Sequence, residues 1–262
     1  LWRNPAAKPV HASGSLACNG AAELCAKRVD EVVYPGSHNA MSNPRVAGWM
    51  FPHQQQTMVR QLEGGIRALL FDVHYGYPAA KGVKTEMQGE VLTEKVKQAI
   101  GVEGFQAALR IRNRLTGAEA GTRNLYLCHG LCELGAYELT PALVEIHDFL
   151  VANPDEVLLL IVEDYVSPRD LAAAFESSGL RDFVYEGGSA PWPRLGDLIR
   201  SGRRVIVFLE SGREGVPWLR PAFQEIRETP YTFRTAQDFR CSPNRGGDAG
   251  SLFLLNHWIE TT

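Results

Sequence analysis

Four apolar runs, each followed directly by polar side chains, constrain the fold of this chain more than any other feature of its sequence. The runs cover residues 31–37, 66–71, 124–128 and 157–162. Uninterrupted runs of this length are typical of strands buried on both faces, as in parallel sheets. The polar groups that follow them are, in chain order, His38, Asn39, Asp72, His129 and Glu163. Because the carboxyl ends of parallel strands meet at one edge, the pattern predicts one shared site.

Helical patterns lie between the later runs. Thr140 marks the start of a helix that ends before Pro154, and Ser167-Pro168 marks the start of another that ends near Gly179. A shorter helix is expected near 54–62, and further strands over 204–209 and 251–255 and, on weaker signals, over 182–185 and 231–234. Strands that alternate with helices predict an α/β barrel. A chain of 262 residues with 45% hydrophobic content is sufficient for one such domain over residues 1–262.

Residues 76–123 form an unusually long connection between the second and third runs. They contain two amphipathic patterns, the first formed by Leu92, Val96, Ala99 and Ile100 and the second by Phe105, Ala108, Leu109 and Leu115. A connection between two strands of the site lies on the catalytic side of a barrel. We therefore expect a helical insertion that is either a lid or substrate-facing subdomain, or a packed hairpin with no role in function.

Charge and hydropathy exclude several function classes. The net charge is -3 and the isoelectric point is about 6.2, so no basic field attracts nucleic acid and none is expected as a partner. No apolar run approaches the length needed to span a membrane. The chain begins at Leu1 rather than methionine, which indicates a processed or trimmed chain whose signal or anchoring segments have been removed.

Five cysteines favour an exported protein, secreted or otherwise extracytoplasmic. The spacings of Cys18 from Cys25 and of Cys128 from Cys132 suit two short local disulfides. Free buried thiols are the alternative. A zinc site at Cys128, His129 and Cys132 is disfavoured because no second Cys/His cluster completes four ligands. Cys241 is left without a sequence-predicted partner.

Four motifs together resemble the catalytic X region of phosphatidylinositol-specific phospholipases C. They are Pro35-Gly36-Ser37-His38-Asn39, then Gly65-Ile66-Arg67 leading into Phe71-Asp72, then Leu127-Cys128-His129-Gly130, and finally Ile161-Val162-Glu163-Asp164-Tyr165. The chain is most similar to the secreted bacterial, fungal and plant branch of phospholipase C-like phosphodiesterases. That branch also carries a cysteine pair resembling Cys18 and Cys25. The resemblance extends from Cys18 to Trp258 apart from the insertion.

The resemblance implies a distorted TIM-type (β/α)8 barrel with the insertion between strands 2 and 3. It also implies cleavage of a phosphodiester by in-line attack on phosphorus. By resemblance His38 acts on the nucleophile side or on the phosphoryl oxygen, and His129 is the acid that protonates the leaving oxygen. Histidine suits these transfers because its ordinary pKa is about 6.5. The implied substrate is a phospholipid or its headgroup diester, and a phospholipid substrate implies peripheral contact with a membrane.

A divalent cation is the expected cofactor. Calcium-independent bacterial relatives place an arginine on the second strand, whereas this chain has Asp72 and His74 there. Asn39, Asp72 and Glu163 would supply oxygen ligands, so we expect calcium, with magnesium as the alternative. His74 is a candidate substrate-binding residue.

One departure from the calcium-dependent relatives lowers the expected ligand count. Leu70 stands where those enzymes carry a second acid. Asp164 is a possible substitute, although neighbouring residues of a strand point to opposite faces and only Glu163 or Asp164 should face the site. Two other functions therefore stay open. One is a non-catalytic barrel used as a binding module. The other is a glycerophosphodiester phosphodiesterase. That class carries an arginine after its first histidine, whereas here Asn39 follows His38, and this argues against it.

Overall fold

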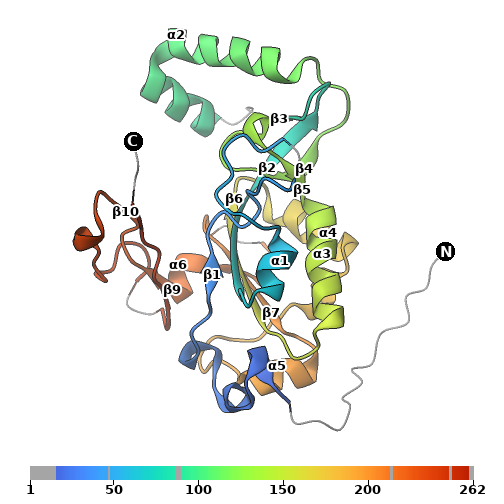
Figure 1. Ribbon diagram of the computed structural model, residues 1–262, viewed down its shortest axis with the longest axis vertical. Coiled ribbons are helices and arrows are strands. Elements are labelled where there is room, and N and C mark those ends of the chain that lie inside the picture. The colour runs from blue at the N-terminus through green and yellow to red at the C-terminus, as the bar shows by residue number, and fades with distance from the viewer. Residues whose placement is uncertain (1–15, 47, 87–89, 213–214, 248–249, 260–262) are drawn as a thin grey trace, which may run out of the picture.

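Strand β2 (Ala68–Pro78) is the centre of the fold, because four other strands pair with it. The computed structural model describes residues 16–46, 48–86, 90–212, 215–247 and 250–259. Its main sheet has eight strands in the order β5-β4-β2-β6-β7-β8, with β1 and β3 also on β2 (Figure 1). The other seven strands are β1 (Gly36–Ser37), β3 (Val83–Thr85), β4 (Asn124–Leu127), β5 (Tyr137–Glu138), β6 (Leu158–Asp164), β7 (Val205–Leu209) and β8 (Leu219–Pro221). The mixed α/β class is as expected.

Strand β2 pairs differently along its two halves. Its first half runs parallel to β1 and β6, whereas its second half runs antiparallel to β3 and β4. The prediction of a parallel strand at 124–128 is therefore wrong. For β4 to pair with β2 in parallel, the chain between them would have to form a crossover connection that packs on the sheet. Instead, helix α2 (Glu90–Thr116) packs on β3 and on the turn η4 (Cys132–Leu134), so β4 enters from the far end of β2 and runs back along it.

Alternating side chains of β2, β6 and β7 form two apolar faces, as the two-residue period of a strand requires. Helices α1 (Met58–Glu63), α3 (Leu139–Ala152) and α4 (Pro168–Ser177) cover one face. The residues that this face buries include Leu69, Phe71, Val73, Leu158, Leu160, Val162, Val205, Val207 and Leu209. The other face, with Ala68, Leu70, Leu159, Ile161, Ile206 and Phe208, packs on α5 (Leu195–Ser201) and on Trp192. Burial on both faces explains the uninterrupted apolar runs.

The start signal predicted at Ser167 is confirmed, whereas α3 begins at Leu139, before the predicted Thr140, and has no side-chain cap. The Ser167 hydroxyl accepts a hydrogen bond from the backbone N–H of Asp170 at 3.1 Å, with Pro168 in the first turn of α4. Thr57 caps α1 in the same way. Gly179, in the left-handed region at φ 76°, leads the chain from α4 directly into a 3-10 turn, η5 (Leu180–Phe183). The strand predicted over 182–185 is therefore replaced by this turn and a single bridge of Val184 to Val205.

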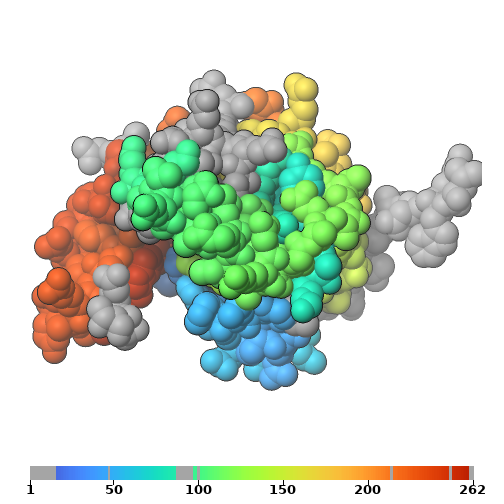
Figure 2. Space-filling model, turned by 90° about the horizontal axis from the view of Figure 1, so that it is seen from above, coloured from blue at the N-terminus to red at the C-terminus, as the bar shows by residue number. Residues whose placement is uncertain are grey.

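The insertion contains a helix, as predicted. Helix α2 is interrupted at Gly101, whose φ of 72° and ψ of 168° are not helical, so two helical segments meet there. Seen from above, α2 lies across the centre of the molecule (Figure 2). Its second segment is held by an ion pair of Arg112 with the buried Glu133 and by a hydrogen bond of Lys84 to Asn113 at 2.9 Å. Strand structure continues into the predicted insertion of residues 76–123, because β2 ends only at Pro78 and pairs there with β3.

The predicted closed TIM-type barrel is not confirmed. Within the described residues the main sheet ends at β5 and β8, and β1 pairs only with β2. The C-terminal segment instead forms two separate two-stranded sheets, and α6 (Ala222–Glu225) precedes them. They pair β9 (Ile226–Glu228) with β11 (Leu252–Leu254), and β10 (Thr232–Phe233) with β12 (Trp258–Ile259). They lie across from α3 on the other side of β1 (Figure 1). The predicted strands over 231–234 and 251–255 are confirmed, although each is shorter than expected.

Beta pairing in the first run is also shorter than expected. Only Gly36–Ser37 pairs with β2, and the chain before it forms the 3-10 turn η3 (Val29–Glu31). Pro35 has no backbone N–H and therefore cannot donate a hydrogen bond to a neighbouring strand. The remaining 3-10 turns are η1 (Cys18–Gly20), η2 (Ala22–Ala26) and η6 (Ala236–Asp238).

Both predicted disulfides are present. Cys18 pairs with Cys25, and Cys128 pairs with Cys132. Because two of its three proposed ligands are bonded to each other, the zinc alternative is excluded. Cys241 is a free, exposed thiol. Among the described residues, no helix is long and apolar enough to cross a membrane.

Candidate active site

Asp72 and His129 form the centre of the candidate site. The antiparallel register places Val73 opposite Leu127, so the chain beyond β4 continues back along β2 and brings His129 to Asp72. Nδ1 of His129 lies 3.0 Å from Oδ2 of Asp72. The Asp72 side chain is 8% exposed and that of His129 is 49% exposed. One partner is therefore a buried carboxylate and the other is an imidazole that a ligand can reach.

The electrostatics of this pair favour a protonated imidazole. The hydrogen bond to Asp72 raises the pKa of His129, and the charges of Asp72 and Glu163 add to it, against an opposing effect of burial. Burial raises the pKa of Asp72, and nearby Glu163 raises it further, although the bond to His129 lowers it. The raised pKa of His129 matters more for chemistry than that of Asp72, because its ring is 49% exposed and a ligand can reach it.

Glu163 lies beside Asp72. The two residues are register partners on the parallel strands β6 and β2, so their side chains leave the same face of the sheet. Tyr165, two positions further along, donates its hydroxyl to Glu163. Asp164 points to the opposite face and accepts a hydrogen bond from the backbone N–H of Ser211 at 2.9 Å. The expectation that only one of Glu163 and Asp164 faces the site is confirmed.

His38 follows β1 and is held under an aromatic side chain from the C-terminal segment. Its ring stacks on Trp258 with centroids 4.8 Å apart, and Trp258 in turn stacks on Tyr231 at 4.8 Å. Burial lowers the pKa of His38, and the neighbouring imidazoles of His129 and His53 lower it further. A neutral His38 beside a readily protonated His129 provides one proton acceptor and one proton donor.

Asn39 lies at the base of the site and is 1% exposed. Its backbone has φ 49°, in the left-handed region that asparagine tolerates. Its side-chain Nδ2 lies 2.9 Å from Nδ1 of His53. The His53 ring also lies 4.9 Å from the His129 ring, at 60° to it. Burial, followed by the charge of His129, lowers the pKa of His53.

His74 does not lie at an open position. It is 3% exposed and stacks on Tyr165, with ring centroids 4.2 Å apart. Burial, and then His129, lowers its pKa to about 4, so its ring is neutral near pH 7. A substrate would reach His74 only if Tyr165 moved away. Its predicted role in substrate binding stays a prediction.

A charged network adjoins the carboxylate pair. Arg245 binds Glu210 at 2.8 Å and the fully buried Glu228 at 2.5 Å. Burial raises the pKa of Glu210 to about 7 despite the attraction of Arg245. Glu228 also contributes to the field at His38. Arg245 therefore lies next to Glu210, a carboxyl group whose pKa the charge of Glu163 also raises.

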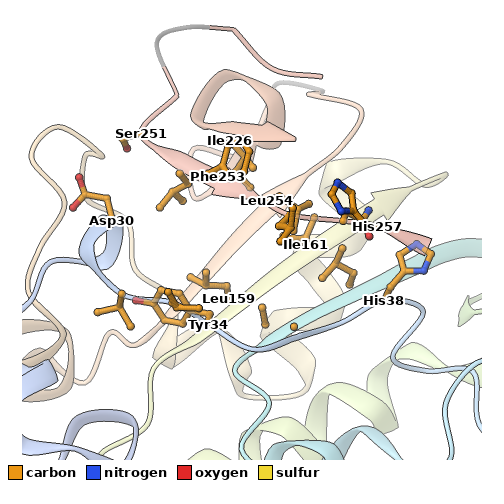
Figure 3. Close-up of a pocket in the computed structure, with 18 residues that line it drawn as sticks. Asp30, Tyr34, His38, Leu159, Ile161, Ile226, Ser251, Phe253, Leu254 and His257 are labelled. Atoms are coloured by element: carbon orange, nitrogen blue, oxygen red, sulfur yellow. The ribbon is translucent and has the colours of Figure 1, made fainter. Parts of the chain in front are cut away.

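A cavity of about 640 Å³ adjoins the site through His38, which is one of the residues that line it (Figure 3). His38 and His257 lie at one end and Asp30 at the other. Leu70 and Ile161 line it, each one alternation below Asp72 and Glu163 on the same face of the sheet. Residues of both β1 and β11 contribute to its lining. Leu70, at the position of the missing second acid, is part of this apolar wall.

The side-chain oxygens of the site are of the type that binds a hard cation, although there are few of them. Asn39, Asp72 and Glu163 offer amide and carboxylate oxygens, the ligands that calcium and magnesium prefer. The bond from Asn39 Nδ2 to His53 leaves its Oδ1 for another partner. No group of three or more His, Cys, Asp or Glu side chains that could hold a metal occurs in the described ranges. Calcium therefore stays a proposal.

The chain was compared with known proteins to test the family resemblance. The family model described as PI-PLC X 1 matches residues 89–262, which is more than half of the chain and includes His129 and Glu163. The chain belongs to the PI-PLC X family. The match begins after His38 and Asp72, so those two assignments depend on the geometry described above.

Relatives of the family align over nearly the whole chain. An "Uncharacterized secreted protein" of Arthroderma benhamiae is 29% identical over 92% of this chain and 47% of its own length. A "PI-PLC X domain-containing protein 1" of the same organism is 26% identical over 94% of this chain and 69% of its length. A PI-PLC X domain-containing protein of Arabidopsis thaliana is 24% identical over 85% and 47%. The chain therefore spans about half the length of two of these relatives. No solved structure matches it.

Three residues of the site have no role predicted from the sequence, although Tyr165 lies within one of the family motifs. His53, Tyr165 and Trp258 each contact a predicted site residue, but none ends an apolar run in the way that His129 does. His53 lies in a loop, and Trp258 comes from the end of the described chain. Only their neighbours in space identify them.

Proposed function

We propose that this protein is a phosphodiesterase that cleaves the phosphodiester of an inositol-type or related phospholipid, or of its headgroup, by proton transfer between two histidines. The observation that carries the proposal is the Asp72–His129 pair in a member of the PI-PLC X family. A carboxylate that raises the pKa of a partly exposed imidazole produces an acid able to protonate a leaving oxygen. His38, with its lowered pKa, is neutral and takes the proton of the nucleophile.

The residues divide the reaction between them. His38 accepts the proton from the attacking hydroxyl as the bond to phosphorus forms. His129 gives its proton to the leaving oxygen as the bond to that oxygen breaks, and Asp72 stabilises the imidazolium before transfer. Asn39, Asp72 and Glu163 would hold a divalent cation, which supplies positive charge for the developing phosphorane. An inositol 2-hydroxyl as nucleophile would release a cyclic phosphate.

A location outside the cytoplasm is part of the proposal. Two disulfides support it, because such bonds persist in oxidising compartments. The name of one relative, a secreted protein, also supports it. Exposed apolar side chains on α2, Val102, Ile111 and Leu115, would provide peripheral contact with a lipid surface.

Phosphorus NMR tests the proposal directly. The protein is incubated with phosphatidylinositol, lysophosphatidylinositol, glycerophosphoinositol and glycerophosphocholine, each with calcium and with chelator. With an inositol-type substrate we expect a new signal from a cyclic phosphodiester, or from the phosphomonoester that forms when water opens it. Turnover of glycerophosphocholine alone would favour the glycerophosphodiester phosphodiesterase. A binding module, to which Leu70 at the second acid position points, would consume none of the four.

A further inference from the structure

We propose that His53 is a third functional histidine, which donates a hydrogen bond from Nε2–H to a non-bridging oxygen of the bound phosphodiester. This inference rests on the proposed function, because it assigns a role within the same site. Two observations motivate it. The ring lies 4.9 Å from that of His129, and its other nitrogen is already bonded to Asn39.

The bond to Asn39 determines which nitrogen carries the hydrogen. The amide nitrogen of Asn39 has only hydrogens to give, so Nδ1 of His53, 2.9 Å away, is the acceptor. The hydrogen of the neutral ring is then on Nε2. In this tautomer His53 cannot take a proton at Nε2, and its free nitrogen is a hydrogen-bond donor. A fixed neutral donor suits a phosphoryl oxygen whose negative charge grows during attack.

The loop that carries His53 is anchored on both sides of the site. The backbone N–H of His53 donates to the carbonyl of Ser42 at 3.1 Å and lies 3.2 Å from its hydroxyl. The side chain of Gln54 donates to the carbonyl of His38 at 2.6 Å. Met50 donates its N–H to Leu134, in the turn after His129, at 2.8 Å. These contacts fix the backbone of the loop, and the bond to Asn39 orients the exposed ring itself.

His53 differs from the other histidines of the site in what it can do. His38 is covered by Trp258, and His129 is paired with the carboxylate of Asp72. His53 is exposed and bonded to a neutral amide, so it contributes a dipole rather than a titrating charge. The three rings thus have separate tasks, with His38 as proton acceptor, His129 as proton donor and His53 as fixed donor to phosphorus oxygen.

Two substitutions separate donation from support of Asn39. In His53→Asn the new carbonyl occupies the place of Nδ1 and keeps the bond to Asn39, whereas the Nε2–H donor is lost. In His53→Gln the new amide nitrogen occupies the place of Nε2 and keeps a donor. We expect His53→Asn to lower kcat on the order of a hundredfold with little change in KM, as for removal of an oxyanion donor. His53→Gln should retain most of the turnover.

Equal turnover of the two variants, or a larger loss in His53→Gln, would overturn the assignment. A binding measurement separates this result from a failure of the proposed function. Dimethyl phosphate, an unreactive phosphodiester, is titrated into protein labelled with ¹⁵N at histidine. The Nε2–H tautomer of His53 and a shift of its Nε2 signal are expected in the unmodified protein, even if no substrate is turned over. An Nδ1–H tautomer, or no shift at saturating dimethyl phosphate, would contradict the inference.

Discussion

Nδ1 of His129 lies 3.0 Å from Oδ2 of Asp72, although 57 residues separate them in the chain. Strand β4 brings them together because it runs antiparallel to β2. A buried carboxylate that holds one imidazole nitrogen leaves the other nitrogen for the substrate. The relationship therefore explains the raised pKa of His129, and it leaves Nε2 as the ring nitrogen that is not bonded to Asp72.

The first prediction concerns the two proton-transfer histidines. Replacing either His38 or His129 by alanine should lower turnover at least about a hundredfold, because each removes one general acid or base. Circular dichroism and thermal melting should show a folded protein, since His129 is an exposed side chain. His147, on α3 and away from the site, provides a matched control, and its replacement by alanine should leave turnover unchanged. A folded His129→Ala variant with near-normal turnover would remove His129 from the mechanism.

The second prediction concerns pH. In the proposed mechanism, activity needs a neutral His38 and a protonated His129. We therefore expect kcat/KM to rise as pH increases through the lowered pKa of His38 and to fall as pH passes the raised pKa of His129. Asp72→Asn removes the charge that raises the pKa of His129. The alkaline limb of the profile should therefore move to lower pH, while the acid limb stays near its place.

A profile of kcat/KM against pH for both proteins checks the second prediction. If the alkaline limb of Asp72→Asn coincided with that of the unmodified protein, the limb would belong to another group. Glu210, whose pKa is raised to about 7, would then be the next residue to replace.

The third prediction concerns the cation. Exhaustive chelation should abolish turnover, and calcium should restore it more effectively than magnesium, because Asn39, Asp72 and Glu163 provide oxygen ligands without a rigid octahedral cage. Leu70→Glu adds a carboxylate on the same face of β2 and should lower the calcium concentration that gives half-maximal rate. Leu159→Glu is the control, because it adds a carboxylate to the same face of the sheet, on β6, but further from Asp72 and Glu163. It should not lower that calcium concentration.

Turnover that persists after chelation would exclude a required metal ion. Arg245 would then be the first candidate for the positive charge, since it is bonded to Glu210 and Glu228 beside the site. Arg245→Met keeps the length of the side chain without the charge and would test that alternative by loss of the chelator-resistant rate.

The fourth prediction concerns the disulfide beside His129. Replacing Cys128 and Cys132 together by serine should lower turnover, because the bond closes the loop that carries His129. The midpoint of thermal unfolding should change little, since a short closed loop removes little entropy from the unfolded chain. The pair Cys18 and Cys25, in the turns before β1, is the matched control and should affect turnover less. Alkylation of Cys128 in the unreduced native protein would contradict the pairing.

The fifth prediction concerns helix α2. Val102, Ile111 and Leu115 are 66%, 57% and 40% exposed, so their joint replacement by serine removes apolar surface without opening the core. The rate with vesicle substrate should fall, whereas the rate with soluble glycerophosphoinositol should not. Arg112→Ala breaks the ion pair with Glu133 next to the His129 turn and should lower both rates. Unaltered relative rates in the serine variant would make the helix a packed hairpin rather than a lipid-facing element.

Much of the fold and part of the site follow from local sequence patterns. The apolar runs predict buried strands, because a strand buried on both faces needs apolar residues at successive positions. Ser167 predicts the start of α4, since its hydroxyl satisfies a backbone N–H that lacks a helical partner. Short spacings predict both disulfides. For the helix start and the disulfides, the deciding interaction lies within a few residues of the signal.

The tertiary structure alone determines how these elements combine. An apolar run reads the same for a parallel and an antiparallel strand, so the direction of β4 depends on where α2 packs. The open sheet depends on the packing of the C-terminal segment, whose strands form two separate two-stranded sheets instead of joining the main sheet. His53 and Trp258 join the site through contacts with Asn39 and His38 from distant segments. Local sequence determines which residues are buried, whereas packing between distant segments decides which side chains meet.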